Sequence, residues 1–567
     1  MATRPIPPHP TRPMSVVMIA GGGAALAFGA TQGRWPFAVF GAFFVGLGAF
    51  QWRMGLAAQV ANAAGAAINR GEMDEARELV ELARARHSLT YVLRLLDSHE
   101  AEIAWREGDL EAAKRLCESA RARRDLVPYG AWRGAHLSHI DGLLSLACAA
   151  SGDDAGAEAA MARVRASDQA YAPALARAEL AFALAQARRG DLEGAHKQLA
   201  RHHVLLSEAL EPRGRALHRA LRRMTALRGS AAYRVPVKMQ AAPGVGAVST
   251  GKAWLSRVFP EGAELVEIDD GAPVAPALAT PEVTRRAPPV RPTKLRAPIK
   301  VVALWIVIVL LFVAIWSLMS EPREPGGPPP DPLPVGVLVV AVLALLVGLV
   351  AWQIVRARRG SRVIEEASRA LVCGELERAE ALALPLRADR NQVVAATASA
   401  VLAGVLERRA DVAGALAECE RAIGLLTGVV GMGASDVLLP QLVATRAYLF
   451  GALGREDESD AELARLSKEF PAFPYAAGFV LRTRLLRAVR RGDLTTAREL
   501  ARARGDVSIG ASGEIIAELV LSTDAEERDE RVASIREDLA MMPALEQWVR
   551  AVLPGFLEYA LPRRAAV

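Results

Sequence analysis

This sequence of 567 residues contains few cysteines and few aromatic residues. Its cysteines are Cys117, Cys148, Cys373 and Cys419, and they form no CxxC pair, so neither a clustered zinc site nor a disulfide framework is indicated. Aromatic residues make up 5% of the chain and do not alternate with its basic clusters, so nucleic acid is not an expected partner. No nucleophile elbow, HExxH motif or dinucleotide fingerprint occurs. The sequence therefore predicts no enzymatic activity and no cofactor.

Histidine is absent from the second half, because all nine histidines lie at or before His218. His136 and His139 are one helical turn apart, and His202 and His203 are adjacent, which are spacings that a metal site can use. No carboxylate or thiol is placed by sequence to complete such a site. We therefore expect packed or solvent-facing histidines and no metal ligands.

The chain consists of two similar halves. In the first half, four glycines follow alanine-rich helical stretches at spacings of 37, 44 and 38 residues. About 302 residues later, four corresponding positions recur at spacings of 36, 44 and 38 residues. The eight positions are Gly71, Gly108, Gly152 and Gly190, then Gly374, Ala410, Gly454 and Gly492. A period near 40 residues, in a chain richer in Ala and Leu than in Val or Ile, predicts a helical solenoid.

Small residues recur five positions after each of these turns, and seven positions before all of them except the last, where Leu485 stands; two antiparallel helices would cross closely at these positions. The runs GEMDEA, GDLEAA, GDLEGA, GELERA and GDLTTA resemble the turn between helix A and helix B of the tetratricopeptide repeat family. The resemblance covers residues 56–228 and 360–540 and lacks most of the large aromatic positions of the consensus. It implies tetratricopeptide-like solenoids that bind other proteins.

Four uncharged apolar segments, residues 14–32, 35–52, 301–319 and 335–355, have about the length that crosses a bilayer as a helix. Basic residues flank both pairs, and the loop between the last two segments is net acidic, so the positive-inside rule predicts four spans. We therefore expect a multi-pass bacterial inner (plasma) membrane protein with both termini and both solenoids in the cytoplasm and basic flanks against anionic lipid. Small residues four apart in the first pair, Gly21 with Ala25 and Ala42 with Gly46, would let its two helices approach closely. A cleaved signal peptide is the alternative for the first segment.

Together these patterns predict an all-α chain of six parts. They are a cytoplasmic arm at 1–13, a transmembrane hairpin at 14–54, a solenoid at 55–228, a Pro/Ala-rich basic linker at 229–299, a second transmembrane hairpin at 300–355 and a second solenoid at 356–560. Inside the linker, Trp254, Leu255, Val258 and Phe259 would share one face of a short helix. A docking motif and an isolated apolar patch in a loop stay open as explanations.

The expected function is a membrane-anchored scaffold or adaptor that binds protein partners on the concave faces of both solenoids without catalysis. The family's groove geometry would place these residues against a partner: Glu102, Trp105, Arg106, Arg177, Arg188, Glu407, Arg408, Tyr448, Arg482 and Arg490. Their excess of Arg favours an acidic partner. Two alternatives stay open. One is a self-assembling membrane organiser, for which a homo-oligomer is compatible with the sequence. The other is a relative of membrane tetratricopeptide proteins associated with tetrapyrrole biosynthesis, which the hairpin before the repeats resembles.

Overall fold

The computed structural model describes residues 12–31, 35–86, 90–123, 130–167, 170–226, 251–265, 360–426, 433–470, 473, 475–504, 507–523 and 528–561. Within these ranges every regular element is a helix and no strand occurs. Most helices pack in consecutive pairs. The all-α, helical-repeat part of the prediction therefore agrees with the structure.

In the first half, each predicted turn joins two packed helices. The pairs are α2 (Trp35–Arg70) with α3 (Met73–Arg86), α4 (Thr90–Arg106) with α5 (Leu110–Ala122), α6 (Gly130–Ser151) with α7 (Asp154–Ala166), and α8 (Ala172–Arg188) with α9 (Leu192–Arg201). The remaining helices are α10 (His203–Ala209), α11 (Pro212–Ala226), α12 (Gly251–Val258) and α13 (Pro260–Ala263). All four turn glycines have φ between 72° and 86°, a left-handed conformation that only glycine adopts without strain.

The second half repeats this arrangement. A helix at residues 360–372 pairs with α16 (Leu376–Ala383), which η3 (Leu384–Ala388) extends; the other pairs are α17 (Gln392–Arg408) with α18 (Val412–Leu426), α19 (Gly433–Ala452) with α20 (Glu456–Glu469), and α21 (Ala476–Arg490) with α22 (Leu494–Arg502). Then follow α23 (Gly510–Leu521), α24 (Arg528–Met541), α25 (Pro543–Val552) and α26 (Phe556–Ala560). Ala410 adopts the same turn conformation as the glycines, with φ of 63°.

The small residues five positions after each turn lie where the paired helices cross. All eight have no exposed surface: Ala76, Ala113, Ala157, Ala195, Ala379, Ala415, Ser459 and Ala497. Four positions further along the same helices, Cys117 and Cys419 are fully buried free thiols. A larger side chain at the crossing would force the two helices apart, which explains why this position stays small in every hairpin.

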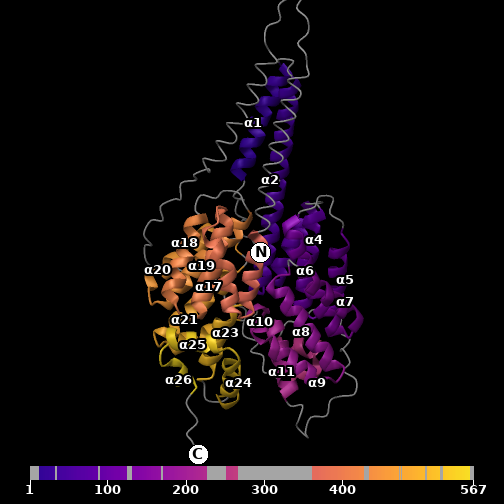
Figure 1. Ribbon diagram of the computed structural model, residues 1–567. Coiled ribbons are helices and arrows are strands. Elements are labelled where there is room, and N and C mark those ends of the chain that lie inside the picture. Colours follow the sequence, from indigo (N-terminus) through magenta and orange to yellow (C-terminus); the bar gives the residue numbers. More distant parts are fainter. Residues whose placement is uncertain are drawn as a thin grey trace, which may run out of the picture.

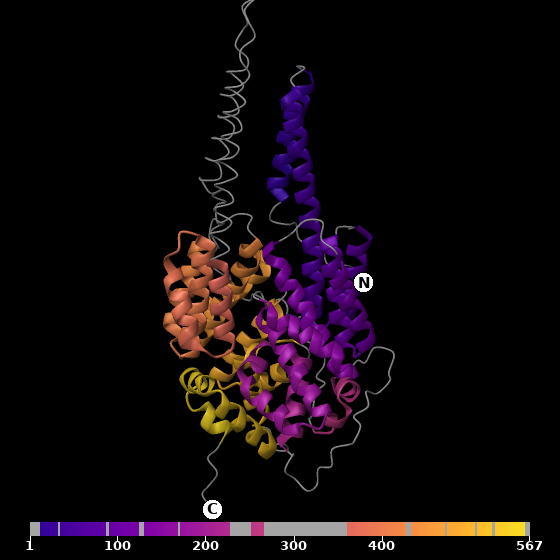
Figure 2. The same ribbon diagram turned by 45° about the vertical axis from the view of Figure 1, so that its right-hand side comes forward.

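The two halves lie side by side, and α1 (Arg12–Thr31) projects from them together with the first part of α2 (Figure 1 and Figure 2). The halves meet where α10 and α11 face α23 and α24. Ion pairs cross this boundary, among them Arg215 with Glu514 at 2.7 Å, Arg219 with Glu518 at 3.1 Å, and Arg222 with Glu537 at 2.9 Å. In these pairs the first half supplies the arginines, and the second supplies the carboxylates.

The membrane topology predicted from the apolar segments is wrong. No helix in the described part of the chain is long and apolar enough to cross a membrane, which overturns the transmembrane hairpin at 14–54 and the multi-pass inner-membrane localisation. Glycine and alanine make up much of α1 and α2, so these segments are less apolar than their lack of charge suggested. The second predicted hairpin, at 300–355, lies outside the described residues.

α1 and α2 nevertheless pack closely, as their small residues predicted, but on a different face. A Cβ atom added to Gly21 or Gly46, the predicted contact positions, would meet nothing within 4 Å. One added to Gly22 would lie 2.8 Å from the carbonyl oxygen of Gly41, and one added to Gly48 would lie 2.8 Å from a side-chain carbon of Ile19. The contact face therefore runs through different glycines than those inferred from spacing.

Candidate partner-binding site

Four of the five predicted groove residues of the first half come together, but they are buried. Glu102, Trp105, Arg106 and Arg177 are each less than a tenth exposed. Arg177 donates hydrogen bonds to both carboxylate oxygens of Glu102, at 2.8 and 2.9 Å, and one to Glu211 at 3.3 Å. Arg106 lies 3.3 Å from Glu102, and the Trp105 indole donates to Glu211 at 3.0 Å. We call these five residues the Glu102 network; its carboxylates and guanidinium groups are paired with each other, while one terminal nitrogen of Arg177 is buried without a hydrogen-bond partner.

Burial and charge act in opposite directions on the Glu102 network. Burial alone would raise the pKa of Glu102, but Arg177 and Arg106 outweigh it and lower that pKa to about 2. Burial alone would lower the pKa of Arg177, but Glu102 and Glu211 outweigh it and raise that pKa above its usual value. The two carboxylates balance the two guanidinium groups. The network therefore holds α4, α8 and the residue before α11 together as one neutral, mutually paired unit.

The arginines two positions before a turn, all predicted to line the groove, instead bind the neighbouring hairpin. Each donates a hydrogen bond to a carbonyl near the C-terminal end of the preceding helix A: Arg106 to Ile68 at 2.6 Å, Arg188 to Ala149 at 2.5 Å, Arg408 to Leu371 and Arg490 to Ala452. Carbonyls at helix C-termini lack intrahelical partners, and a cation stabilises them. We call these four residues the clamp arginines. They stand in the second and fourth hairpins of each half.

A smaller cluster occupies the corresponding region of the second half. Arg482 donates to Glu407 at 2.6 Å, and its guanidinium lies over the ring of Tyr448, 3.5 Å from the centroid. Tyr448 donates its hydroxyl to Ser512 at 3.3 Å, and burial raises its pKa to about 12. Arg408 pairs with Glu208 of the first half at 3.1 Å. Each of the ten predicted groove residues is thus engaged by another part of the chain.

Sequence reasoning missed a ladder of buried acids in the first half. Asp97, Asp141 and Glu179 each stand eleven positions before a turn and are less than a tenth exposed. An arginine on helix B of the preceding hairpin binds each one: Arg84 binds Asp97 at 2.8 Å, Arg121 binds Asp141 at 2.5 Å, and Arg165 binds Glu179 at 2.7 Å. The signal was available as acids at one fixed offset within apolar helices. In the second half this offset falls on Ser399, Val443 and Leu481.

The segment at 251–265 docks on the first half, which decides between the two explanations left open for it. Its apolar residues have no exposed surface: Trp254, Leu255, Val258 and Phe259. The Trp254 ring meets Trp105 edge to face, with centroids 5.2 Å apart, and its indole N–H donates to the Trp105 carbonyl at 2.7 Å. A Cβ atom on Gly108 would lie 3.3 Å from this ring. The turn of the second hairpin therefore forms part of the docking surface.

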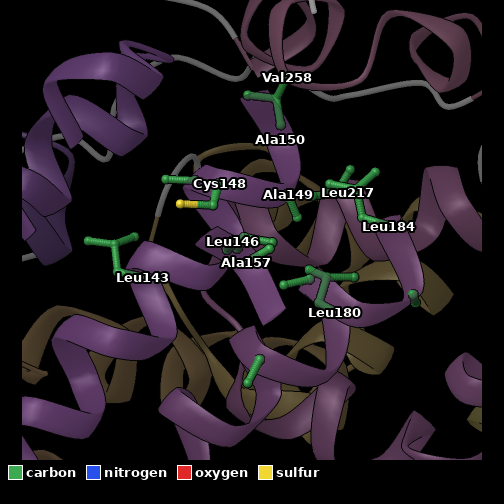
Figure 3. Packing of buried hydrophobic residues seen from close by; sticks show 14 of the residues in the cluster. Leu143, Leu146, Cys148, Ala149, Ala150, Ala157, Leu180, Leu184, Leu217 and Val258 are labelled. Carbon is green, nitrogen blue, oxygen red and sulfur yellow. The ribbon is translucent and has the colours of Figure 1, made fainter. Parts of the chain in front are cut away.

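The C-terminal part of this segment reaches the next two hairpins. Figure 3 shows Val258 beside Ala150 at the end of α6. The clamp arginine Arg188 donates its second terminal nitrogen to the Val258 carbonyl at 3.1 Å, while it also binds Ala149. The segment thus lies across the C-terminal ends of α4, α6 and α8. We call this surface the turn edge.

Comparison with known proteins assigns no family to this chain. It matches no protein-family model, no curated protein and no solved structure.

The histidines singled out by their spacing are packed side chains. Burial lowers the pKa of His139 to about 3 and the pKa of His136 below its usual value. His139 also stacks on Tyr171, with ring centroids 5.8 Å apart. Burial likewise lowers the pKa of His202, and it lowers the pKa of His203 to about 3. In the described ranges, no group of three or more His, Cys, Asp or Glu residues is placed to hold a metal ion.

Proposed function

We propose that this protein is a non-enzymatic scaffold that binds helical segments of partner proteins on its tetratricopeptide-like repeats. The observation that carries the proposal is the docked segment at 251–265. Its capture uses an aromatic anchor, buried apolar side chains and hydrogen bonds to backbone carbonyls, the contacts by which helical peptides are recognised in grooves.

The proposed interaction surface is the turn edge, whereas the sequence predicts the groove residues. A partner that used the Glu102 network would have to replace contacts among side chains that are already paired and buried. A partner at the turn edge would instead displace residues 251–265, whose contacts are buried apolar side chains and hydrogen bonds to carbonyl oxygens, without separating a buried ion pair. The turn edge is therefore the better candidate for partner binding.

Photo-crosslinking of the full-length protein tests the scaffold proposal. A photoreactive residue at Arg189, which follows α8 beside the turn edge and is 45% exposed, should give saturable adducts with a defined protein partner. The matched control places the photoreactive residue at Lys197, which is 75% exposed on α9. This position should give no such adducts. Equal adduct formation from the two positions, or no protein adduct from either, would contradict the proposal.

Self-assembly is a second candidate, which the projecting hairpin favours. Phe28 and Phe43 are 48% and 61% exposed on α1 and α2, and exposed aromatic residues of this kind mark association surfaces. Light scattering of the protein should show an oligomer that Phe43→Glu converts to a monomer. A wild-type monomer at micromolar concentration would remove this candidate.

A further inference from the structure

The docked segment has a counterpart in the second half. From Trp254 the chain reads WLSRVFP, and from Trp548 it reads WVRAVLP. Both runs place Trp, an apolar residue, two variable residues, Val, an apolar residue and Pro in the same order. We call this pattern the W-motif. The tryptophans are fully or almost fully buried in each case, and both pack against an aromatic residue: Trp254 against Trp105, and Trp548 against Tyr448 with centroids 6.1 Å apart.

The same clamp arginine holds the W-motif in each half. Arg188 donates to the carbonyl of Val258 at 3.1 Å, and Arg490, its equivalent 302 residues later, donates to the carbonyl of Val552 at 3.1 Å. Each arginine also binds the end of the preceding helix A. The turn edge and its ligand therefore occur twice, with the Val carbonyl of the motif recognised in the same way.

The two W-motifs reach their sites along different paths. α25 follows α24 after the single residue Met542, whereas residues 227–250 separate α11 from α12. Because two different connections deliver the same motif to the same kind of edge, its recognition depends on the motif's own contacts. The first edge satisfies the motif more completely: the indole N–H of Trp254 has an acceptor, whereas that of Trp548 is buried without one.

We propose that the turn edge of the first half is a binding site for a W-motif helix supplied in trans by a partner protein, with residues 251–265 acting as a built-in competitor. This inference rests on the proposed function. The partner's helix would present Trp to Trp105 and Gly108, apolar residues at the second, fifth and sixth positions, and a Pro that ends the helix and leaves the Val carbonyl open to Arg188.

Because residues 251–265 already occupy the turn edge, a partner must bind tightly enough to displace them. A segment tethered to its own site has an effective concentration on the order of millimolar, which strengthens its occupancy by about 10²–10⁴-fold over the same segment added freely. A W-motif in trans should therefore bind the intact chain weakly. It should bind a chain whose own motif has been disabled about 100-fold more tightly or better.

A fluorescent peptide of residues 249–265 tests this on the full-length protein by anisotropy. We expect the Trp254→Ala/Phe259→Ala chain to bind it at least about 100-fold more tightly than the wild type does. A peptide with alanine in place of its tryptophan should not bind. The matched control is Glu264→Ala, at an exposed position of the same segment, which should leave peptide binding as weak as in the wild type.

A second variant keeps the test valid if the double variant unfolds. Protease sites within 240–248 and 268–275 would release the native segment from an otherwise unaltered chain, and its exchange with labelled peptide would be measured after dilution. No exchange, or binding that ignores the tryptophan of the peptide, would overturn the inference. A partner that crosslinks at Arg189 while the peptide fails to bind would leave the scaffold intact and remove only the W-motif.

Discussion

Replacing Glu102 with Gln should destabilise the first half strongly, because the substitution removes the charge that two buried arginines share. Arg177 and Arg106 are each 4% exposed, so neither can turn to solvent without opening the fold. Breaking a buried pair of this kind costs about 3–5 kcal/mol. The pKa of Glu102 gives a similar magnitude: its lowering from 4.5 to about 2 corresponds to roughly 3 kcal/mol of stability at neutral pH.

The pH dependence of this effect has a definite sign. Because the folded-state pKa of Glu102 is lowered, its contribution is complete above pH 4.5 and is lost as the pH falls toward 2. Hydrogen exchange of α4 and α8 at pH 7 should report an opening free energy about 3–5 kcal/mol lower in Glu102→Gln than in the wild type. The difference should narrow in acid, where the wild-type carboxylate is itself protonated.

Two further variants separate charge pairing from simple loss of packing. Glu158→Gln disrupts an ion pair whose members are 45% and 56% exposed, and it should cost under about 1 kcal/mol. Glu102→Gln/Arg177→Met leaves Arg106 and Glu211 to balance each other, so it should recover at least half of the lost stability. If the double variant were as unstable as the sum of its two single variants, the reasoning from a charge-balanced network would be refuted.

Three other predictions concern stability. Ala410→Gly should raise the thermal midpoint of the second half, because relief of left-handed strain exceeds the entropy cost of glycine by roughly 0.5–1 kcal/mol; a lower midpoint would contradict this. Asp141→Leu should cost about 2 kcal/mol by urea titration, since the two arginines it pairs with lose charge-assisted hydrogen bonds but can rehydrate; an unchanged midpoint would exclude a stabilising ladder. Burial lowers the pKa of His203 to about 3 and the pKa of His218 below its usual value, so unfolded chains bind protons more readily below pH 6.5. His203 should then remove about 2 kcal/mol by pH 5, and His218 should act in the same direction; His203→Gln should reduce this acid sensitivity in a pH-resolved melt.

The repeat positions were predictable because they depend on local sequence. A left-handed turn favours glycine and a close helix crossing requires a small residue, so both recur at fixed offsets in the sequence. Gly71 is an example of the first and Ala76 of the second. The roles of the charged residues were not predictable in the same way. Arg177 reaches Glu211 from another helix, and Arg188 reaches Ala149 in another hairpin, so the sequence around either arginine does not reveal that it is buried and paired.

The W-motifs were not found from the sequence and the predicted membrane spans were wrong, for different physical reasons. The W-motifs lie 294 residues apart, from Trp254 to Trp548, so a search at the duplication offset of 302 misaligns them. The membrane prediction failed because absence of charge was taken as hydrophobicity. Glycine adds little to transfer free energy, and the segment from Arg12 to Thr31 contains several glycines.

The boundary between the halves shows what one chain can do that two identical chains cannot. In a symmetric dimer the same patch appears on both partners, so a stripe of arginines at the twofold axis would meet itself. Within one chain the two halves can differ: the first carries Arg215, Arg219 and Arg222, and the second carries their carboxylate partners Glu514, Glu518 and Glu537 at the facing surface. Two first halves from separate molecules would bring these arginines against each other at this surface. At α11, α23 and α24 the charge division therefore favours contact between unlike halves over contact between like halves, and contact between unlike halves is what the single chain makes with itself.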